Sequence, residues 1–133
     1  MSERLVLVDS SVWISYLLGQ KEALARSVEK LLLDHRVAIN AVIRVELLMG
    51  AKDEAQYAEL EDSFEGLHFL ELTDAVWRRT EHLRFELRQA GTVVPLPDAL
   101  IACCALVYNC ELLHADRHFD RIARSAAVKV HRI

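Results

Sequence analysis

The stretch Leu5-Val6-Leu7-Val8-Asp9-Ser10-Ser11 is an apolar run that ends in a carboxylate and two hydroxyls. A short apolar run bounded by polar residues is typical of a strand that is buried on both faces of a sheet. We therefore expect a strand at about residues 4–9, followed at once by a helix from Ser11. Asp9 ends this strand, where a carboxylate either caps the next helix or takes part in a ligand site.

Short apolar runs alternate with helical patterns along the rest of the 133-residue chain. This alternation is typical of α/β proteins, in which helices flank a parallel sheet. A chain of this length forms one core, so we expect a single domain over residues 1–133. The further expected strands lie at about residues 37–39, 67–71, 111–114 and 128–131, and the expected helices at 11–18, 22–34, 40–49, 53–65, 73–90 and 98–109.

Two of the expected helices differ in their apolar pattern. The helix from Thr73 has one apolar stripe with the 3.6-residue period, formed by Val76, Thr80, Leu83, Leu87 and Ala90, and Gly91 ends it. A loop at residues 92–97 with two prolines leads to the helix at 98–109, which is apolar on every side. Such a helix is buried all round, either by a neighbouring helix and the sheet or by a second subunit. We place three reduced thiols in it, Cys103, Cys104 and Cys110, and expect no zinc site because no C-x-x-C pair is present.

The composition is that of a globular protein, with 53% apolar residues, 27% charged residues and a formal net charge of −4. A negative net charge argues against a surface that binds nucleic acid over its whole extent. Arginines nevertheless gather in the expected helix at 73–90 and in a further expected helix that contains Arg117, Arg121 and Arg124. Arg84, Arg88 and Arg117 are weak candidates for nucleic-acid contacts or simply part of solvated faces. We find no apolar segment as long as a membrane span and no signal peptide, so we expect a cytoplasmic protein without a membrane partner.

Four carboxylates stand beside or within apolar segments. Asp9 and Asp116 each follow an expected strand, and the carboxyl ends of parallel strands meet at one edge of a sheet, where ligands bind. Glu46 lies inside the apolar stripe of its helix, where an unpaired carboxylate is costly. Asp98 opens its helix directly after Pro97. A partly buried carboxylate cluster needs a cation, and hard ions such as Mg²⁺ commonly assist phosphate-ester chemistry.

Each of these carboxylates also has a structural alternative. Asp9 and Asp116 are residues that often cap helices, and the helix dipole alone favours Asp98 in a first turn. Glu46 can instead be held in the core by an ion pair. Metal-dependent phosphoryl chemistry is therefore a prediction that depends on the fold bringing the four side chains together.

The sequence around these carboxylates resembles the PIN-domain ribonucleases, and more closely the VapC-type toxins of prokaryotic toxin–antitoxin pairs. Their order, their spacing and the chain length all agree, so the resemblance covers essentially the whole chain. The segments that carry it are Val8-Asp9-Ser10-Ser11-Val12-Trp13-Ile14, Val45-Glu46-Leu47-Leu48-Met49-Gly50, Pro97-Asp98-Ala99-Leu100-Ile101-Ala102 and Leu112-Leu113-His114-Ala115-Asp116-Arg117-His118-Phe119.

The resemblance implies a three-layer α/β/α sandwich with a central parallel β-sheet, and endonucleolytic cleavage of RNA. It implies a Mg²⁺ or Mn²⁺ site built from Asp9, Glu46, Asp98 and Asp116, with Ser11 as the hydroxyl beside the first aspartate. A bound ion would polarise the scissile phosphate and lower the pKa of a water, which Asp98 or Asp116 orients for attack. Arg84, Arg88 and Arg117 become weak candidates for RNA binding.

Partners are expected on two grounds. An apolar stripe on Trp13, Ile14 and Leu17, together with the all-apolar helix, predicts a homodimer. The resemblance adds a cognate antitoxin that reaches into the acidic pocket with a basic side chain. Two residues depart from the family pattern: His114 stands where Thr or Ser is usual, and His118 where a further Asp often appears. Either histidine can alter metal affinity or pH dependence.

Other functions are weighed against this one. A haloacid-dehalogenase-like phosphatase needs a second Asp two residues after the first, and that position is Ser11. A receiver-type signalling domain needs a central phosphoacceptor Asp and a later Lys, and neither stands at a matching place. The alternatives that remain are a catalytically inactive PIN-like interaction domain and a different metal-dependent phosphohydrolase; degenerate copies normally lose one acid, and all four are present here.

Overall fold

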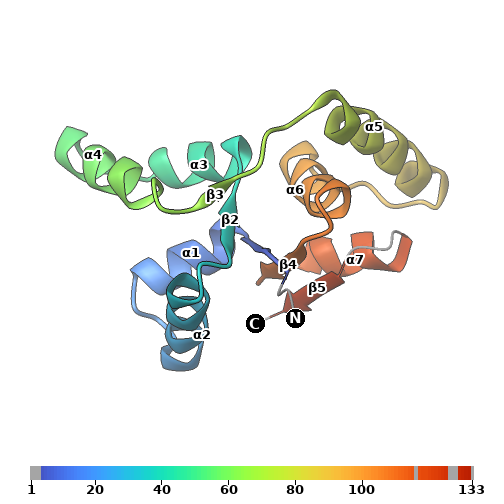
Figure 1. Ribbon diagram of the computed structural model, residues 1–133. Coiled ribbons are helices and arrows are strands. Elements are labelled where there is room, and N and C mark those ends of the chain that lie inside the picture. Colours follow the sequence, from blue (N-terminus) through green and yellow to red (C-terminus); the bar gives the residue numbers. More distant parts are fainter. Residues whose placement is uncertain (1–3, 116, 126–128, 133) are drawn as a thin grey trace.

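The computed structural model describes residues 4–115, 117–125 and 129–132 of the chain (Figure 1). Strands and helices alternate along it, as the apolar pattern predicts. The strands are β1 (Val6–Val8), β2 (Val37–Ile39), β3 (His68–Phe69), β4 (Glu111–His114) and β5 (Lys129–Arg132). The helices are α1 (Ser10–Leu17), α2 (Glu22–Leu33), α3 (Ala41–Leu48), α4 (Glu54–Ser63), α5 (Asp74–Gln89), α6 (Leu96–Val107) and α7 (Arg117–Ser125).

The strands form one sheet in the order β3-β2-β1-β4-β5, and every pairing in it is parallel. From β1 the chain moves outward to β2 and β3, and then returns to place β4 on the other side of β1. Right-handed crossovers in these two directions put the connecting helices on opposite faces of the sheet. Figure 1 shows this arrangement, with α1 to α4 on one side and α5 to α7 on the other. The predicted three-layer α/β/α sandwich is confirmed.

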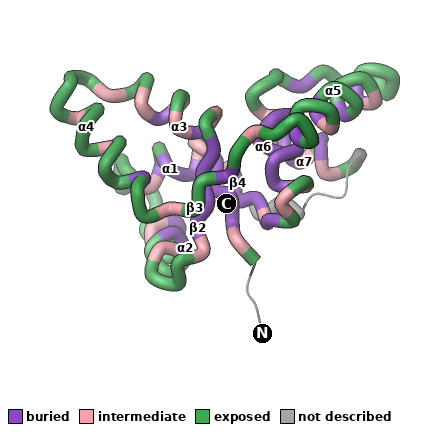
Figure 2. The backbone as a smooth tube through the Cα atoms, turned by 45° about the horizontal axis from the view of Figure 1, so that its top comes forward, coloured by how far each residue is buried: buried purple, intermediate pink, exposed green. Residues whose placement is uncertain are grey.

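The core is centred on the middle strands and on α6 (Figure 2). All three residues of β1 and of β2 are buried, because helices cover both faces of the sheet. In α6, every residue from Ala99 to Ala105 is buried. Helix α5 packs along α6 and covers the side of α6 that faces away from the sheet. The all-apolar helix is therefore buried by a neighbouring helix and the sheet, as one of the two expectations had it. None of the described helices is both long enough and apolar enough to cross a bilayer.

Several boundaries differ from the expected ones. Strand β1 is shorter than residues 4–9, although the Leu5 carbonyl and the Asp9 N–H still bond to Glu111 and Leu113 of β4 at 3.0 and 2.9 Å. Helix α6 begins at Leu96, two residues before Asp98. Pro97 fits in this first turn because its missing N–H has no partner there in any helix. The loop predicted at 92–97 therefore ends at Pro95, the N-cap of α6.

Three residues differ from the sequence-based expectation in their element or in their burial. Cys110 follows the end of α6 instead of lying in it, although it is a buried free thiol like Cys103 and Cys104. Ala90 is exposed, because it caps the end of α5 just before Gly91, whose φ of +85° turns the chain away. Trp13 is buried in the core, so it does not belong to the exposed apolar stripe with Ile14 and Leu17.

Candidate active site

The first carboxylate, Asp9, lies where β1 ends and α1 begins. It is only 4% exposed, and its Oδ2 accepts hydrogen bonds from the N–H and the Oγ of Ser11 at 3.1 and 2.5 Å. The Ser11 Oγ in turn accepts a hydrogen bond from the Ala115 N–H at 3.1 Å, at the end of β4. Asp9 is therefore the N-cap of α1, and this cap also joins the carboxyl ends of the two adjacent strands β1 and β4.

The second carboxylate, Glu46, reaches this edge of the sheet from α3. Asn40 follows β2 and caps α3 by accepting a hydrogen bond from the Ile43 N–H at 3.0 Å, which directs the helix back over the strand ends. Six residues after Asn40, Glu46 Oε1 accepts a hydrogen bond from Ser10 Oγ at 3.0 Å. This bond joins α3 to the first residue of α1.

Burial raises the pKa of Glu46 above its ordinary value, while the hydrogen bond from Ser10 lowers it. The charges of Asp9 and Asp98 raise the pKa further. Two like charges shift a third group in this way only when they lie close to it, since solvent screens distant charges. Asp9 and Asp98 therefore both lie within electrostatic reach of Glu46.

The third carboxylate, Asp98, comes from the opposite helical layer. It lies in the first turn of α6, where the positive end of the helix dipole favours a negative side chain. Helices α3 and α6 contact each other although they belong to different layers, and this contact brings Asp98 toward Glu46. The acidic cluster thus draws on the end of β1, on α3 and on α6.

This place in the fold is the topological switch point of the sheet. The chain leaves β1 toward β2 on one side and later returns to β4 on the other side. In open parallel sheets, ligands bind outside the carboxyl ends of the strands at such a point. Asp9 ends β1 at the switch point, so the acidic cluster has the location of a ligand site.

The remaining predicted site residues fall in a segment of which the structure describes little. Asp116 lies outside the described residues, and only the backbone of Arg117 and His118 is described, as the start of α7. Their roles therefore stay predictions. Their chain neighbour Ala115 is bonded to Ser11, next to Asp9.

His114, one of the two departures from the family pattern, is fully buried at the end of β4. Its ring packs against Phe119, with 5.1 Å between the ring centroids, and its Nε2 lies 3.5 Å from Oδ1 of Asp120. Both partners belong to α7. His114, the last residue of β4, therefore contacts helix α7 on the other side of the predicted ligand Asp116.

The donor set of the acidic cluster consists of oxygen atoms, the ligands that Mg²⁺ and Mn²⁺ prefer. Among the described residues, no three His, Cys, Asp or Glu side chains are already arranged as a ligand group. Mg²⁺ keeps several waters and binds proteins through one or two carboxylates, so a ready-made cage is not required. A partly buried carboxylate whose pKa is raised by two nearby carboxylates fits a hydrated divalent cation.

Sequence reasoning missed Ser10 as a site residue. Its hydroxyl orients Glu46, which lies 36 positions away in sequence. A signal was present, because Ser10 directly follows Asp9 at the end of the strand. A serine in that position also serves as an ordinary first residue of a helix, and only the packing of α3 on α1 shows its second role.

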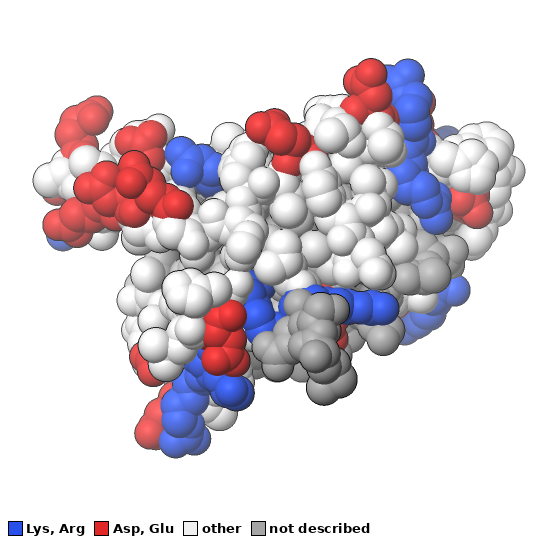
Figure 3. Space-filling model, in the orientation of Figure 1, with Lys and Arg blue, Asp and Glu red and all other residues white. Residues whose placement is uncertain are grey.

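The charged side chains are distributed unevenly over the two helical layers (Figure 3). Acidic side chains cover α4, while arginines gather over α5. Arg84 and Arg88 both line a small hollow of about 240 Å³ at the end of α5. The structure therefore brings these two candidate RNA contacts together.

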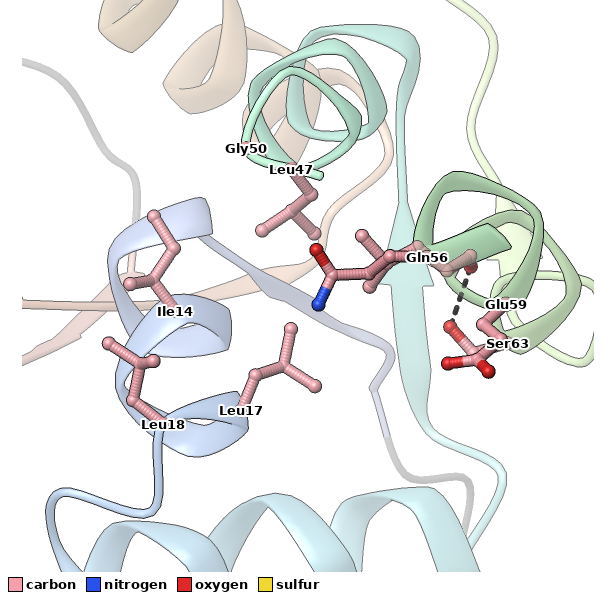
Figure 4. A pocket seen from close by; sticks show the side chains of 9 residues that line it. Ile14, Leu17, Leu18, Leu47, Gly50, Gln56, Glu59 and Ser63 are labelled. Carbon is pink, nitrogen blue, oxygen red and sulfur yellow. Dashed lines mark hydrogen bonds between the residues drawn. The ribbon is translucent and has the colours of Figure 1, made fainter. Parts of the chain in front are cut away.

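A larger apolar groove lies between α1, α3 and α4 (Figure 4). Its volume is about 580 Å³, and α1 contributes Ile14, Leu17 and Leu18 to it. Leu47 of α3 and Leu60 of α4 line the facing walls. Three apolar side chains of α1 that are about half exposed or more are unusual in a helix that also packs on a core. We refer to this surface as the α1–α4 groove.

Comparison with known proteins agrees with this geometry. The profile of the PIN domain family matches residues 6–125. Ribonuclease VapC11 of Mycobacterium tuberculosis is 34% identical over 124 residues, which cover 90% of this chain and 92% of that protein.

Solved structures show the same fold. A chain of VapBC-5 from Mycobacterium tuberculosis, a member of the VapBC family of toxin–antitoxin systems, is 26% identical with a TM-score of 0.74 and covers 98% of this chain and 100% of its own. A chain of DNA-bound VapBC from Salmonella typhimurium has a TM-score of 0.81 at 21% identity, with 98% of each chain covered. Taken with the match over residues 6–125, the chain belongs to the PIN domain family, and VapC ribonucleases of similar length are its relatives.

Proposed function

We propose that this protein is a metal-dependent endoribonuclease, the toxin of a toxin–antitoxin pair. The observation that carries the proposal is that Asp9 ends β1 at the switch point of the sheet, and that Asp9 and Asp98 are both close enough to Glu46 to raise its pKa. The names of the VapC ribonuclease relatives support RNA as the substrate. A structural role does not require three carboxylates from three elements to lie together, because like charges destabilise the fold.

A divalent ion, Mg²⁺ or Mn²⁺, would be held by these three carboxylates and Asp116, and would supply Lewis-acid polarisation of the scissile phosphate and an activated water. The protein side chains hold the carboxylates in place. Ser11 holds Asp9, and Ser10 holds Glu46, so both carboxylates are oriented before substrate arrives. Asp98, on the rigid first turn of α6, or Asp116 orients the water for in-line attack.

The cognate antitoxin is the proposed protein partner. The solved relatives include toxin–antitoxin complexes, and the α1–α4 groove offers an apolar surface for such a partner. The acidic side chains of α4 along one wall favour a partner with basic residues beside its apolar face. A homodimer and a cytoplasmic location are part of the same proposal. Light scattering of the isolated chain tests the homodimer, which a monomer at high micromolar concentration would contradict.

The test of the proposed activity replaces each carboxylate with its isosteric amide: Asp9→Asn, Glu46→Gln, Asp98→Asn and Asp116→Asn. We expect RNA cleavage in Mn²⁺ to fall by about a hundredfold or more in each variant, because a ligand or water-orienting group is lost. The melting temperature should hold or rise in the Glu46 variant, since the repulsion within the cluster falls. Growth arrest on expression gives a second readout.

Glu29→Gln is the matched control, because Glu29 is an exposed carboxylate on α2. This control should cleave RNA like the parent. If all four amide variants cleave like the parent, the nuclease proposal is wrong and the catalytically inactive interaction domain becomes the better explanation. If only Asp116→Asn stays active, His118 is the first residue to examine as a substitute ligand.

A further inference from the structure

A second hollow lies near the carboxyl end of α5, on the layer opposite to the α1–α4 groove. It has a volume of about 240 Å³ and is lined by Arg84, Phe85, Arg88, Thr92, Val93 and Val94. We refer to it as the α5 hollow. One wall is the last two turns of the helix, and the other is the segment that leads to α6.

The arginines of α5 differ in their partners. Arg78 lies 3.4 Å from a carboxylate oxygen of Glu81, and Arg79 lies 3.6 Å from one of Glu86. Within the part of the chain that the structure describes, neither Arg84 nor Arg88 is in an ion pair. The two lie four residues apart, on one face of the helix. The α5 hollow therefore has positive charge that no described carboxylate neutralises.

An exposed aromatic ring lies in the same hollow. Phe85 is 60% exposed and Val93 is 67% exposed, although both are large apolar side chains. An exposed aromatic ring beside guanidinium groups is the combination with which proteins bind unpaired bases and the phosphates next to them. Neither residue is needed for the core, which α5 contacts through Val76, Thr80, Leu83 and Leu87.

The α5 hollow is joined to the acidic cluster through the segment before α6. Arg84 donates hydrogen bonds from Nε and Nη2 to the Val94 carbonyl, at 3.4 and 3.2 Å. Val94 is itself buried and precedes Asp98 by four residues, so their Cα atoms are at most about 14 Å apart. A strand of RNA with its scissile phosphate beside Asp98 would pass close to the hollow.

We propose that the α5 hollow is a nucleotide-binding subsite for the RNA substrate, which rests on the proposed ribonuclease function. An unpaired base stacks on Phe85 and contacts Val93, and Arg88 binds the adjacent phosphate. Arg84 is a positioning residue, because its hydrogen bonds to Val94 hold the wall of the hollow in place and orient the segment that leads to Asp98.

Charge distinguishes this surface from the α1–α4 groove. The groove is lined mainly by apolar side chains together with Glu59 of α4, and the carboxylates of α4 repel RNA. The α5 hollow has the opposite charge and lies on the layer that supplies Asp98. RNA is therefore the occupant that its chemistry favours, and a second copy of the chain is the competing occupant.

The test measures binding of a short labelled single-stranded RNA of mixed sequence by fluorescence anisotropy. The Asp9→Asn background prevents cleavage during the measurement. Adding Phe85→Ala should weaken binding by about fivefold to a hundredfold, because one stacked base is lost, and should leave the salt dependence unchanged. Adding Arg88→Ala should weaken binding and also lower the slope of log affinity against log salt by about 0.7, the value for one phosphate contact on a single strand.

Arg78→Ala is the matched control, because Arg78 is an exposed arginine of the same helix that already pairs with Glu81. It should change neither the affinity nor the slope. Equal binding by all three variants would overturn the proposal, as would absence of RNA binding by the Asp9→Asn protein itself. Conversion of a dimer to a monomer by Phe85→Ala in analytical ultracentrifugation would assign the surface to a second copy instead.

Cleavage by the otherwise unaltered protein separates this proposal from the proposed function. If the parent cleaves RNA and Phe85→Ala and Arg88→Ala bind and cleave normally, only the subsite is wrong. If RNA binds through Phe85 and Arg88 but no variant or parent cleaves it, the subsite stands and the nuclease proposal fails.

Discussion

Helices α4 and α5 are the outer helices of the two layers, and they differ in both burial and charge. Helix α4 has no buried residue, and the chain from Asp53 to Ser63 has five carboxylates and no basic residue. Helix α5 buries four side chains and has four arginines beside three carboxylates. The acidic layer borders the apolar groove, and the basic layer contains the α5 hollow, so we interpret the first as the partner side and the second as the substrate side.

The acidic cluster lies between these two layers and depends on both. Glu46 comes from α3 on the acidic side, and Asp98 from α6 on the basic side. A site of this kind forms only when the two layers pack on the same sheet. The comparison therefore predicts that substitutions in either layer affect activity, while those in the outer helices separate partner binding from substrate binding.

The largest expected effect follows from removing one carboxylate from each layer. Glu46→Gln and Asp98→Asn should each lower RNA cleavage by about a hundredfold or more, and the double variant should lose little beyond the worse single variant, because residues that act as a unit are not additive. Single-turnover cleavage rates in Mn²⁺ measure this. Fully multiplicative losses in the double variant would show that the two layers contribute independently.

The next effect concerns the partner side. Leu17→Asp places a charge in the α1–α4 groove and should weaken binding of the cognate antitoxin by about a hundredfold. The reason is that loss of a central apolar contact typically costs an interface about 2 kcal/mol or more. Calorimetry of the purified pair measures it, and RNA cleavage by the free toxin should not change. The control is Leu33→Asp, an exposed leucine on α2 outside the groove. Equal loss in both variants would place the antitoxin elsewhere.

A smaller effect is expected from the divalent ion that we propose at the acidic cluster. Mn²⁺ or Mg²⁺ at a hundred times its dissociation constant should stabilise the fold by about 2.7 kcal/mol, which raises the melting temperature by several degrees, while K⁺ should not. The shift should disappear both in Glu46→Gln and in Asp98→Asn. A melting temperature that is the same in millimolar Mn²⁺ and in EDTA would count against a shared metal site.

The smallest effect is expected at the opposite edge of the sheet. Arg36 Nη2 lies 3.4 Å from Glu111 Oε2, and Arg36 Nε donates to the Arg4 carbonyl at 2.9 Å. Arg36→Gln should lower the free energy of unfolding by about 1 kcal/mol, since these side chains are still in contact with water. Cleavage should be unchanged, because the pair is at the amino ends of the strands. Urea denaturation together with the cleavage assay checks both points.

The fold was predictable because its elements are encoded by local patterns. The apolar run of β1 and the 3.6-residue stripe of α5 are read from single segments, and the expected β2 and β4 agree with the structure to the residue. The boundaries that failed depend on hydrogen bonding between segments. β3 pairs along only two residues, and α6 takes Leu96 and Pro97 into its first turn.

The sequence by itself also determined where two carboxylates of the proposed site lie in the fold. A carboxylate that ends a strand of a parallel sheet must lie at the binding edge, which fixes Asp9, and a carboxylate within an apolar stripe must point inward, which fixes Glu46. What only the tertiary structure decided is how distant segments meet. The contact of α3 with α6 and the bond from Ser10 to Glu46 depend on how the helices pack on one sheet, and packing is a property of surfaces that no single segment contains.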